Sequence, residues 1–472
     1  MKHILTPMIL AAALVALPAS ADESTILDPA IKAQAEALMA AGLKDDVGLE
    51  FTESLTTEIG PRLAGSDAEW RARQWAMVKL KDLNFQQAYI EDFNIPYWER
   101  VTETASVAGD NPQNLAITAL GGSKSTAKGG IEAEVVRFTS LADLKAAPAD
   151  ALKGRIAFID ERMVRAQDGS GYGYAVAKRG GCAQAAADLG AVACLIRSVG
   201  TDSHRMPHTG GMSREGALGA LPAAALATPD ADQLARLLER GAVKVKLNIQ
   251  VKAADSAASG NVIAEVEGAS LKDEIVLIAC HLDSWDLGTG AIDDAAGCGI
   301  VVAAAKLIQD LPLKPKRTIR VVLYGSEEVG LYGGKAYGEA HADELESHVL
   351  VAESDFGAGR VWRLTTGFGD GAMAYAKAMQ VLVAPLGIVP GDNSSKGASD
   401  VSVLGNLGVP AISPDQEGTD YFDLHHTPDD TFDKIDPAAF RQNVATYAAL
   451  TYLAAETGWD FRKAAKPEMT DR

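Results

Sequence analysis

Residues 274–294 read EIVLIACHLDSWDLGTGAIDD, and this stretch decides the fold class. The unbroken apolar run from Ile275 to Cys280 predicts a strand. That strand leads directly into His281 and Asp283, and a glycine-rich turn then carries Asp293 toward the next helix. Open α/β sheets bind their ligands outside the carboxyl ends of the strands, so we expect a functional site here.

The same pattern recurs on the C-terminal side of this stretch. Apolar runs at 318–324 and 348–353 predict two more strands, and residues 295–309 predict a helix. The second strand ends in Glu327 and Glu328, and the third in Asp355. Strands that alternate with helices predict an α/β fold, with a mostly parallel mixed sheet flanked by helices.

The N-terminal side differs in character. Residues 30–95 have a helical pattern interrupted by a turn at 60–66, whereas residues 101–257 show short apolar strands between Gly, Pro and Ser clusters. We therefore expect an inserted β-rich domain at residues 105–255. Residues 22–104 and 256–472 would form the domain that carries the polar strand ends.

Composition limits the class of protein. The 472 residues are 47% hydrophobic and 23% charged, as in globular chains with a large core. The net charge of −19 argues against nucleic acid as a partner, because phosphate binding needs a concentrated basic surface.

Residues 1–21 are predicted to be a signal peptide. A short basic start precedes an apolar run, Ile9 to Leu17, and a small-residue cleavage site ends at Ala21. The run is too short to span a bilayer and no later segment is long enough without a charge, so we expect an exported protein, periplasmic or secreted, with no membrane span. In an oxidising compartment the pairs Cys182–Cys194 and Cys280–Cys298 form disulfides or remain buried thiols, and the sequence leaves both open.

A late segment adds two histidines, His425 and His426, to the polar side chains at the strand ends. Two histidines and several carboxylates at one sheet edge are costly to bury unless a cation balances them. Imidazole and carboxylate ligands without thiolates suit catalytic zinc or a similar divalent ion.

Five motifs in this order carry a resemblance to a known family: His-x-Asp-Ser at 281–284, Gly-Ala-x-Asp-Asp at 290–294, Glu-Glu-x-Gly-Leu at 327–331, Ser-Asp at 354–355 and His-Thr-x-x-Asp-Thr at 426–431. The chain resembles the two-zinc aminopeptidases and carboxypeptidases of family M28. It most closely resembles the carboxypeptidase Q branch, through the segments 60–66, 196–199 and 207–210 and the double histidine. The insertion is similar to a protease-associated domain.

The resemblance implies a zinc exopeptidase-like fold and a role for each matching residue. One zinc ion would be held by His281 and Asp355, the other by Glu328 and His426, with Asp293 bridging them and followed by a cis peptide bond. The Asp283 carboxylate would accept the free N–H of His281. As general base, Glu327 would take a proton from a water molecule polarised by the ions.

Five further residues are candidates for substrate contact. His425 is expected to be structural or to form a pocket wall, His208 to line the cleft or lie on an exposed loop, and Ser399 and Asp400 to contact substrate or cap a helix. Tyr421 belongs to the same candidate set.

The predicted function is an exported di-zinc exopeptidase acting on dipeptides or short peptides, with cobalt or manganese as substitute metals. The alternatives are an aminopeptidase acting on longer peptides, a one-zinc glutaminyl cyclase-like enzyme, and a receptor that has lost its metals. The complete ligand set argues against the last two. A homodimer remains open.

Overall fold

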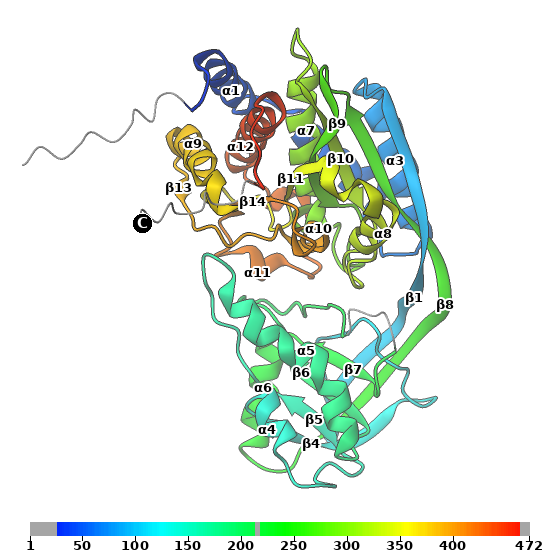
Figure 1. The fold of residues 1–472 in the computed structure, drawn as a ribbon. Coiled ribbons are helices and arrows are strands. Elements are labelled where there is room, and N and C mark those ends of the chain that lie inside the picture. The colour runs from blue at the N-terminus through cyan, green and yellow to red at the C-terminus, as the bar shows by residue number, and fades with distance from the viewer. Residues whose placement is uncertain (1–25, 213–217, 463–472) are drawn as a thin grey trace, which may run out of the picture.

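The computed structural model describes residues 26–212 and 218–462. The predicted signal peptide, residues 1–21, lies outside the described residues. Two parts lie one above the other in Figure 1, and we call residues 26–104 with 256–462 the main part and residues 105–255 the inserted part. No helix within the described ranges is long and apolar enough to cross a membrane.

The main part is built on a mixed sheet, as predicted. Its strand order is β13-β12-β14-β11-β9-β10-β8, and β9 pairs in parallel with both β10 and β11. The strands are β8 (Lys244–Val266), β9 (Leu271–His281), β10 (Arg317–Tyr324), β11 (His348–Glu353), β12 (Val361–Gly367), β13 (Val389–Pro390) and β14 (Ala411–Gln416).

Strand β9 shows why this sheet is covered on both sides. Val276 and Ile278 pack into one apolar cluster and Ile275 and Leu277 into another, because successive side chains of a strand point to opposite faces. Both sets are apolar, so each face needs a helical layer.

Helices supply those two layers (Figure 1). One cluster includes residues of α1 (Pro29–Gly42), α2 (Val47–Ser54), α3 (Asp67–Asp82), α7 (Ala296–Gln309), α9 (Met373–Val383) and α12 (Pro437–Glu456). The other includes residues of α8 (Tyr332–Ala340) and α10 (Ser402–Asn406). Local signals set the helix starts: Ser66 accepts a hydrogen bond from the Glu69 amide at α3, and Asp436 accepts one from the Ala438 amide at α12.

The sheet continues into the inserted part, where β8 pairs with β4 and the order runs on as β4-β5-β6-β7-β3. The strands of the inserted part are β2 (Gln113–Leu115), β3 (Ile117–Ala119), β4 (Ile131–Phe138), β5 (Ile156–Ile159), β6 (Ala193–Arg197) and β7 (Ala223–Leu226), and its helices are α4 (Leu141–Lys145), α5 (Ser170–Asp188) and α6 (Thr228–Leu238). Ala175 and Ala183 of α5 pack on one face of this sheet, whereas Ala231 and Leu234 of α6 pack on the other.

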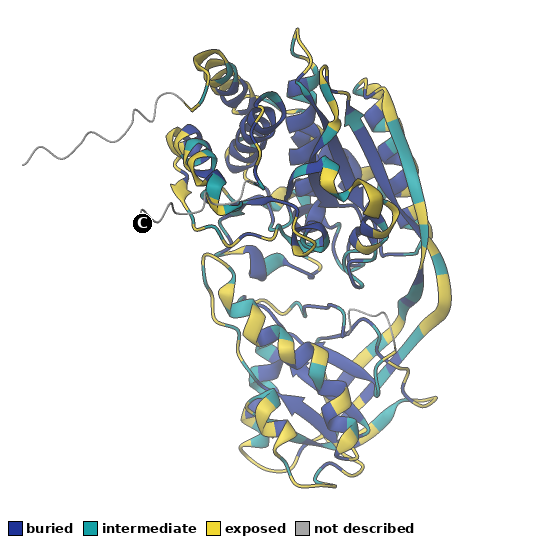
Figure 2. Ribbon diagram, in the orientation of Figure 1, coloured by how far each residue is buried: buried dark blue, intermediate teal, exposed yellow. Residues whose placement is uncertain are grey.

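A long two-stranded ribbon joins the two parts. Strand β1 (Gln87–Val107) pairs antiparallel with β8 along nearly its whole length, and residues 252–256 of the ribbon are exposed (Figures 1 and 2). The prediction that the helical pattern extends to residue 95 was wrong, because residues 87–95 pair with residues 257–265 of β8. Because residues 257–265 lie far away in sequence, no local pattern in residues 87–95 predicts this strand pairing. Positions 104 and 255, where we placed the domain boundaries, fall inside these two strands.

Candidate metal centre

The ends of β9 and β11 bring together a first group of polar side chains. His281, the last residue of β9, has its Nε2 atom 3.0 Å from Oδ1 of Asp293 and 3.2 Å from Oδ1 of Asp355, which follows β11. All three side chains are at most 8% exposed. One histidine and two carboxylates therefore converge at the sheet edge where the sequence placed them.

Asp293 also belongs to a second group. Its Oδ2 atom lies 3.3 Å from Nε2 of His426, and the same Nε2 lies 2.9 Å from Oε2 of Glu328. Asp293 thus lies between the two groups, with one oxygen toward each. His425 stacks on His426 with ring centroids 3.5 Å apart, and its Nε2 is 3.6 Å from Asp293.

These residues fit a pair of divalent cations. Asp293 Oδ2 and Glu328 Oε1 are buried and make no hydrogen bond, which is costly for carboxylate oxygens unless a cation contacts them. The donor atoms are imidazole nitrogens and carboxylate oxygens, the set that zinc and similar ions accept at catalytic sites. Asp293 belongs to both groups and would offer one oxygen to a cation in each.

The chain around Asp293 is held from two sides. Asp430 accepts hydrogen bonds from the amides of Ile292 and Asp293, and Asp294 accepts from the amides of His281 and Gly297. The peptide bond between Asp293 and Asp294 is cis, as the family resemblance implied. This network fixes the turn that presents the Asp293 carboxylate to both groups.

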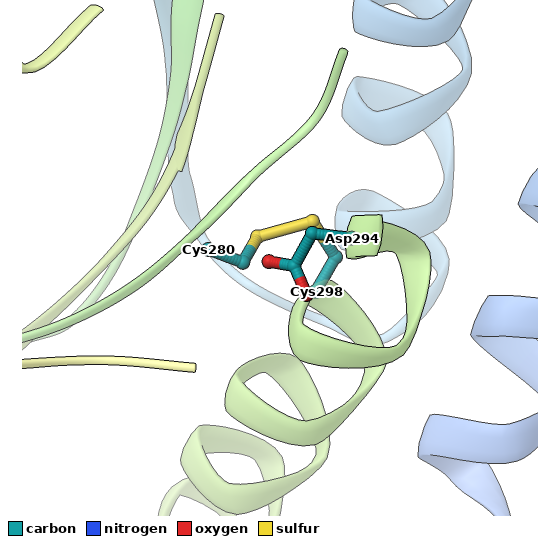
Figure 3. A group of neighbouring side chains, drawn as sticks. All are labelled: Cys280, Asp294 and Cys298. Atoms are coloured by element: carbon teal, nitrogen blue, oxygen red, sulfur yellow. A yellow bond between two sulfur atoms is a disulfide. The ribbon is translucent and has the colours of Figure 1, made fainter. Parts of the chain in front are cut away.

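A disulfide links the two segments that carry His281 and Asp293. Cys280, the residue before His281, is bonded to Cys298 in the first turn of α7, and their Cα atoms are 5.0 Å apart. Figure 3 shows the Asp294 carboxylate beside this bond. The second pair, Cys182–Cys194, is also bonded. The structure therefore decides the question that spacing left open, and all four cysteines are paired.

Asp283 differs from the prediction in the atom it uses. The partner of His281 Nδ1 is the backbone carbonyl of Asp283 at 3.0 Å, whereas the Asp283 carboxylate is 3.8 Å away. That carboxylate instead accepts from the amides of Glu327 and Glu328 at 3.0 and 3.4 Å. The carbonyl fixes the histidine tautomer, and the carboxylate positions the loop that carries the two glutamates.

The electrostatics of the site reflect crowded carboxylates. Burial raises the pKa of Glu327 well above its ordinary value, and the Asp355 carboxylate raises this pKa further. Burial raises the pKa of Asp283 to about 8. Burial and the neighbouring His426 lower the pKa of His425 well below its ordinary value. Divalent cations among these carboxylates would oppose the upward shifts.

A cavity of about 420 Å³ opens in front of this cluster. Glu327, Ser399, Tyr421 and His425 line it, and Ser399 Oγ donates a hydrogen bond to Asp355. The inserted part contributes the facing wall through Tyr172, Val176, Arg179, Gly180, Gly211 and Met212.

Two candidate residues lie elsewhere. Asp400 is fully buried behind Ser399, where its carboxylate accepts from the Gly334 amide. His208 is 1% exposed and uses both ring nitrogens inside the protein, so it neither lines the cavity nor lies on an exposed loop, and both predicted alternatives were wrong.

Arg179 is the site residue that sequence reasoning missed. It lies on α5, is 7% exposed, and lines the cavity beside Glu327 and Asp355. Its Nη1 donates to the Thr209 carbonyl and its Nη2 to the Tyr172 hydroxyl, while Nε is buried and makes no hydrogen bond. Within residues 26–212 and 218–462 its hydrogen-bond partners are a carbonyl and a hydroxyl, and no carboxylate pairs with it. No motif marks it, because its relevance depends on how the inserted part is docked.

Comparison with known proteins gives consistent matches. The sequence model described as peptidase family M28 matches residues 261–451. Carboxypeptidase Q of Mus musculus is 34% identical over 403 residues, which cover 85% of this chain and 84% of that protein. Aminopeptidase YwaD of Bacillus subtilis is 26% identical over 85% of this chain and 83% of its own length. The crystal structure of a peptidase M28 precursor from Shewanella amazonensis superposes with a TM-score of 0.90 at 48% identity, covering 93% of this chain and 99% of that one.

Proposed function

The chain belongs to peptidase family M28 and is a metallo-exopeptidase, and on that premise we propose that it is an exported di-zinc enzyme that hydrolyses dipeptides and short peptides with a free C-terminal carboxylate. The observation that carries the substrate class is Arg179, a buried guanidinium without a carboxylate partner in the wall of the catalytic cavity. A planar guanidinium with free N–H donors suits a carboxylate.

In this proposal His281 and Asp355 hold one ion, Glu328 and His426 hold the other, and Asp293 contacts both. When bound, the ions would supply Lewis-acid polarisation of the scissile carbonyl and of the attacking water. The main part is the catalytic domain, and the inserted part closes the cavity on the opposite side.

Glu327 is the proposed general base. It lines the cavity but makes no contact with His281 or His426 such as the ligand carboxylates make, and its backbone amide is fixed by Asp283. Its carboxylate would take a proton from the attacking water and deliver it to the leaving amine, a step worth about 10²–10⁴-fold. Ser399 orients the Asp355 carboxylate, and Arg179 would hold the substrate carboxylate.

The second candidate is an aminopeptidase that removes N-terminal residues from longer peptides, favoured by the similarity to aminopeptidase YwaD. The cluster of acidic groups in the cavity would also suit a free substrate amine.

One experiment separates the two. The mature protein would be assayed on free dipeptides, on the same dipeptides as C-terminal amides and on longer peptides, before and after chelation and zinc addition. We expect chelator-sensitive cleavage of the free dipeptides, none with Glu327→Gln, and slow cleavage of the amides. Equal rates on acid and amide, together with trimming of long peptides from the N-terminus, would favour the aminopeptidase instead.

A further inference from the structure

The metal-ligand segment of the main part is bound directly by the inserted part. Three hydrogen bonds join residues 208–209 to residues 425–426, and we call these three bonds the cross-contact. The Thr209 amide donates to the His426 carbonyl at 3.0 Å, and His426 Nδ1 donates to the Thr209 carbonyl at 3.2 Å. The ring of His208 donates from Nδ1 to the His425 carbonyl at 2.8 Å.

The backbone at His426 needs such support. His426 has φ +62°, in the left-handed region that residues other than glycine seldom adopt. Its carbonyl and the preceding carbonyl are both acceptors in the cross-contact, so the bonds hold the peptide units on each side of this conformation. The bond from His426 Nδ1 to the Thr209 carbonyl fixes the ring of His426, because it leaves Nε2 as the nitrogen that faces Asp293 and Glu328.

His208 is itself held rigidly. Its Nε2 lies 2.7 Å from Oδ1 of Asp202, and both side chains are at most 1% exposed. Its backbone amide donates to Ser198 Oγ at 2.9 Å. Gly200 lies so close to the ring that an added Cβ would be 2.3 Å from it, so the segment is shaped around this histidine.

The docking has further links, which do not touch His426. Arg165 of the inserted part donates to Asp420 and Asp423, and the Thr201 amide donates to the Phe422 carbonyl. Figure 1 shows α11 (Tyr421–Leu424) on the side of the main part that faces the inserted part. The Arg165 links provide a comparison for the cross-contact, since they join the same two parts.

We propose that His208, held by Asp202, is a positioning residue for His426, so that docking of the inserted part sets the affinity for the ion held by His426 and Glu328. The inference rests on the proposed two-ion site. The partner of the His426 ring is the Thr209 carbonyl, and His208, the preceding residue, holds that segment in place through its bond to the His425 carbonyl. Loss of the partner of a ligating histidine commonly changes metal affinity by about 10–100-fold. The ion held by His281 and Asp355 has no such link, because the partner of His281 Nδ1 is Asp283 of the main part.

The test is a metal titration of the full chain after chelation, with zinc binding followed by competition with a chromophoric chelator. We expect the wild-type protein to bind two ions. His208→Ala should bind one ion with unchanged affinity and the second about 10–100-fold more weakly. His208→Asn, whose amide can still donate near the position of Nδ1, should recover most of that affinity, and Arg165→Ala should bind both ions normally.

Near-UV circular dichroism of the metal-free variants would check that they are folded. If His208→Ala does not fold, Asp202→Asn takes its place, and we expect the same weaker binding of the second ion. Two ions bound with wild-type affinity by a folded His208→Ala chain, or both weakened equally, would overturn the inference while leaving the proposed function intact. The same holds if Arg165→Ala reproduces the loss. A wild-type chain that binds one ion would overturn the two-ion site and the inference with it.

Discussion

Replacing Arg179 with glutamine tests the substrate class most directly. The change removes a buried positive charge from the cavity wall and leaves a shorter, neutral polar side chain. If Arg179 binds the C-terminal carboxylate of the substrate, the variant should lose activity on free dipeptides and keep its activity on the corresponding amides.

The magnitude follows from the donors that remain available. Nη1 and Nη2 carry two N–H groups each and use one each, for the Thr209 carbonyl and the Tyr172 hydroxyl, so each keeps one N–H for a substrate carboxylate. A hydrogen bond to a charged group contributes about 1.5–3 kcal/mol. Loss of one such bond should lower kcat/KM by about 10- to 150-fold, since 1.36 kcal/mol corresponds to a factor of ten.

The assay is the ratio of kcat/KM for a dipeptide to kcat/KM for its C-terminal amide, measured for wild type, Arg179→Gln and Arg165→Gln. Arg165 is the matched control, a cation of the inserted part whose side chain is 37% exposed and does not line the cavity. We expect the ratio to fall only in Arg179→Gln. An equal loss on acid and amide, or an unchanged ratio, would refute the assignment of Arg179 to the carboxylate.

Three further predictions concern the base, the disulfide and the response to pH. Glu327→Gln should lower kcat by about 10²–10⁴-fold with an unchanged number of bound ions. Glu328→Gln should instead weaken metal binding. Activity assays paired with metal analysis test both, and loss of an ion from both variants would contradict the two roles. Replacing Cys280 and Cys298 together by alanine should lower the free energy of unfolding by about 3 kcal/mol, because the disulfide closes a loop of 18 residues. Urea unfolding of the variant and of wild type measures this difference, and coinciding midpoints would contradict it. His348 is buried and hydrogen-bonded to Tyr337 and the Glu344 carbonyl, and burial lowers its pKa to about 4. The unfolded chain therefore binds a proton between about pH 6.5 and 4 that the folded chain does not, so the free energy of unfolding should fall by up to about 3 kcal/mol as pH falls through that window. In urea unfolding at several pH values, His348→Gln should show a weaker dependence of this free energy on pH. An equally strong dependence in the variant would show that other groups cause it.

Much of the fold could be predicted because its signals are local. An apolar run predicts the strand at 275–280. Its alternating side chains pack into two separate clusters, as expected for a strand covered on both faces. The ribbon was only partly predictable. Residues 87–95 lack a pattern that distinguishes a half-exposed strand from a helix, and their strand conformation comes from pairing with residues 257–265.

The candidate site divides in the same way. The metal-ligand candidates His281, Asp293, Glu328, Asp355 and His426 follow strands or lie in short motifs, so the sequence could nominate them and the structure brings them together. The roles of Asp283 and His208 depend on which atom faces which neighbour. Asp283 contacts the His281 ring through its backbone carbonyl and not its carboxylate, and the His208 ring contacts the His425 carbonyl and not the cavity, which only coordinates show.

Residue types at short spacing were enough to predict the α/β class, the order of the polar strand ends and the chemistry of the ligands. The packing of the two parts was needed to show that Arg179 lines the cavity and that Thr209 contacts His426, since both contacts join segments well over 100 residues apart. The physical reason is that the ribbon of β1 and β8 sets where the inserted part docks, and a docking geometry is a property of two packed surfaces rather than of any local run of residues.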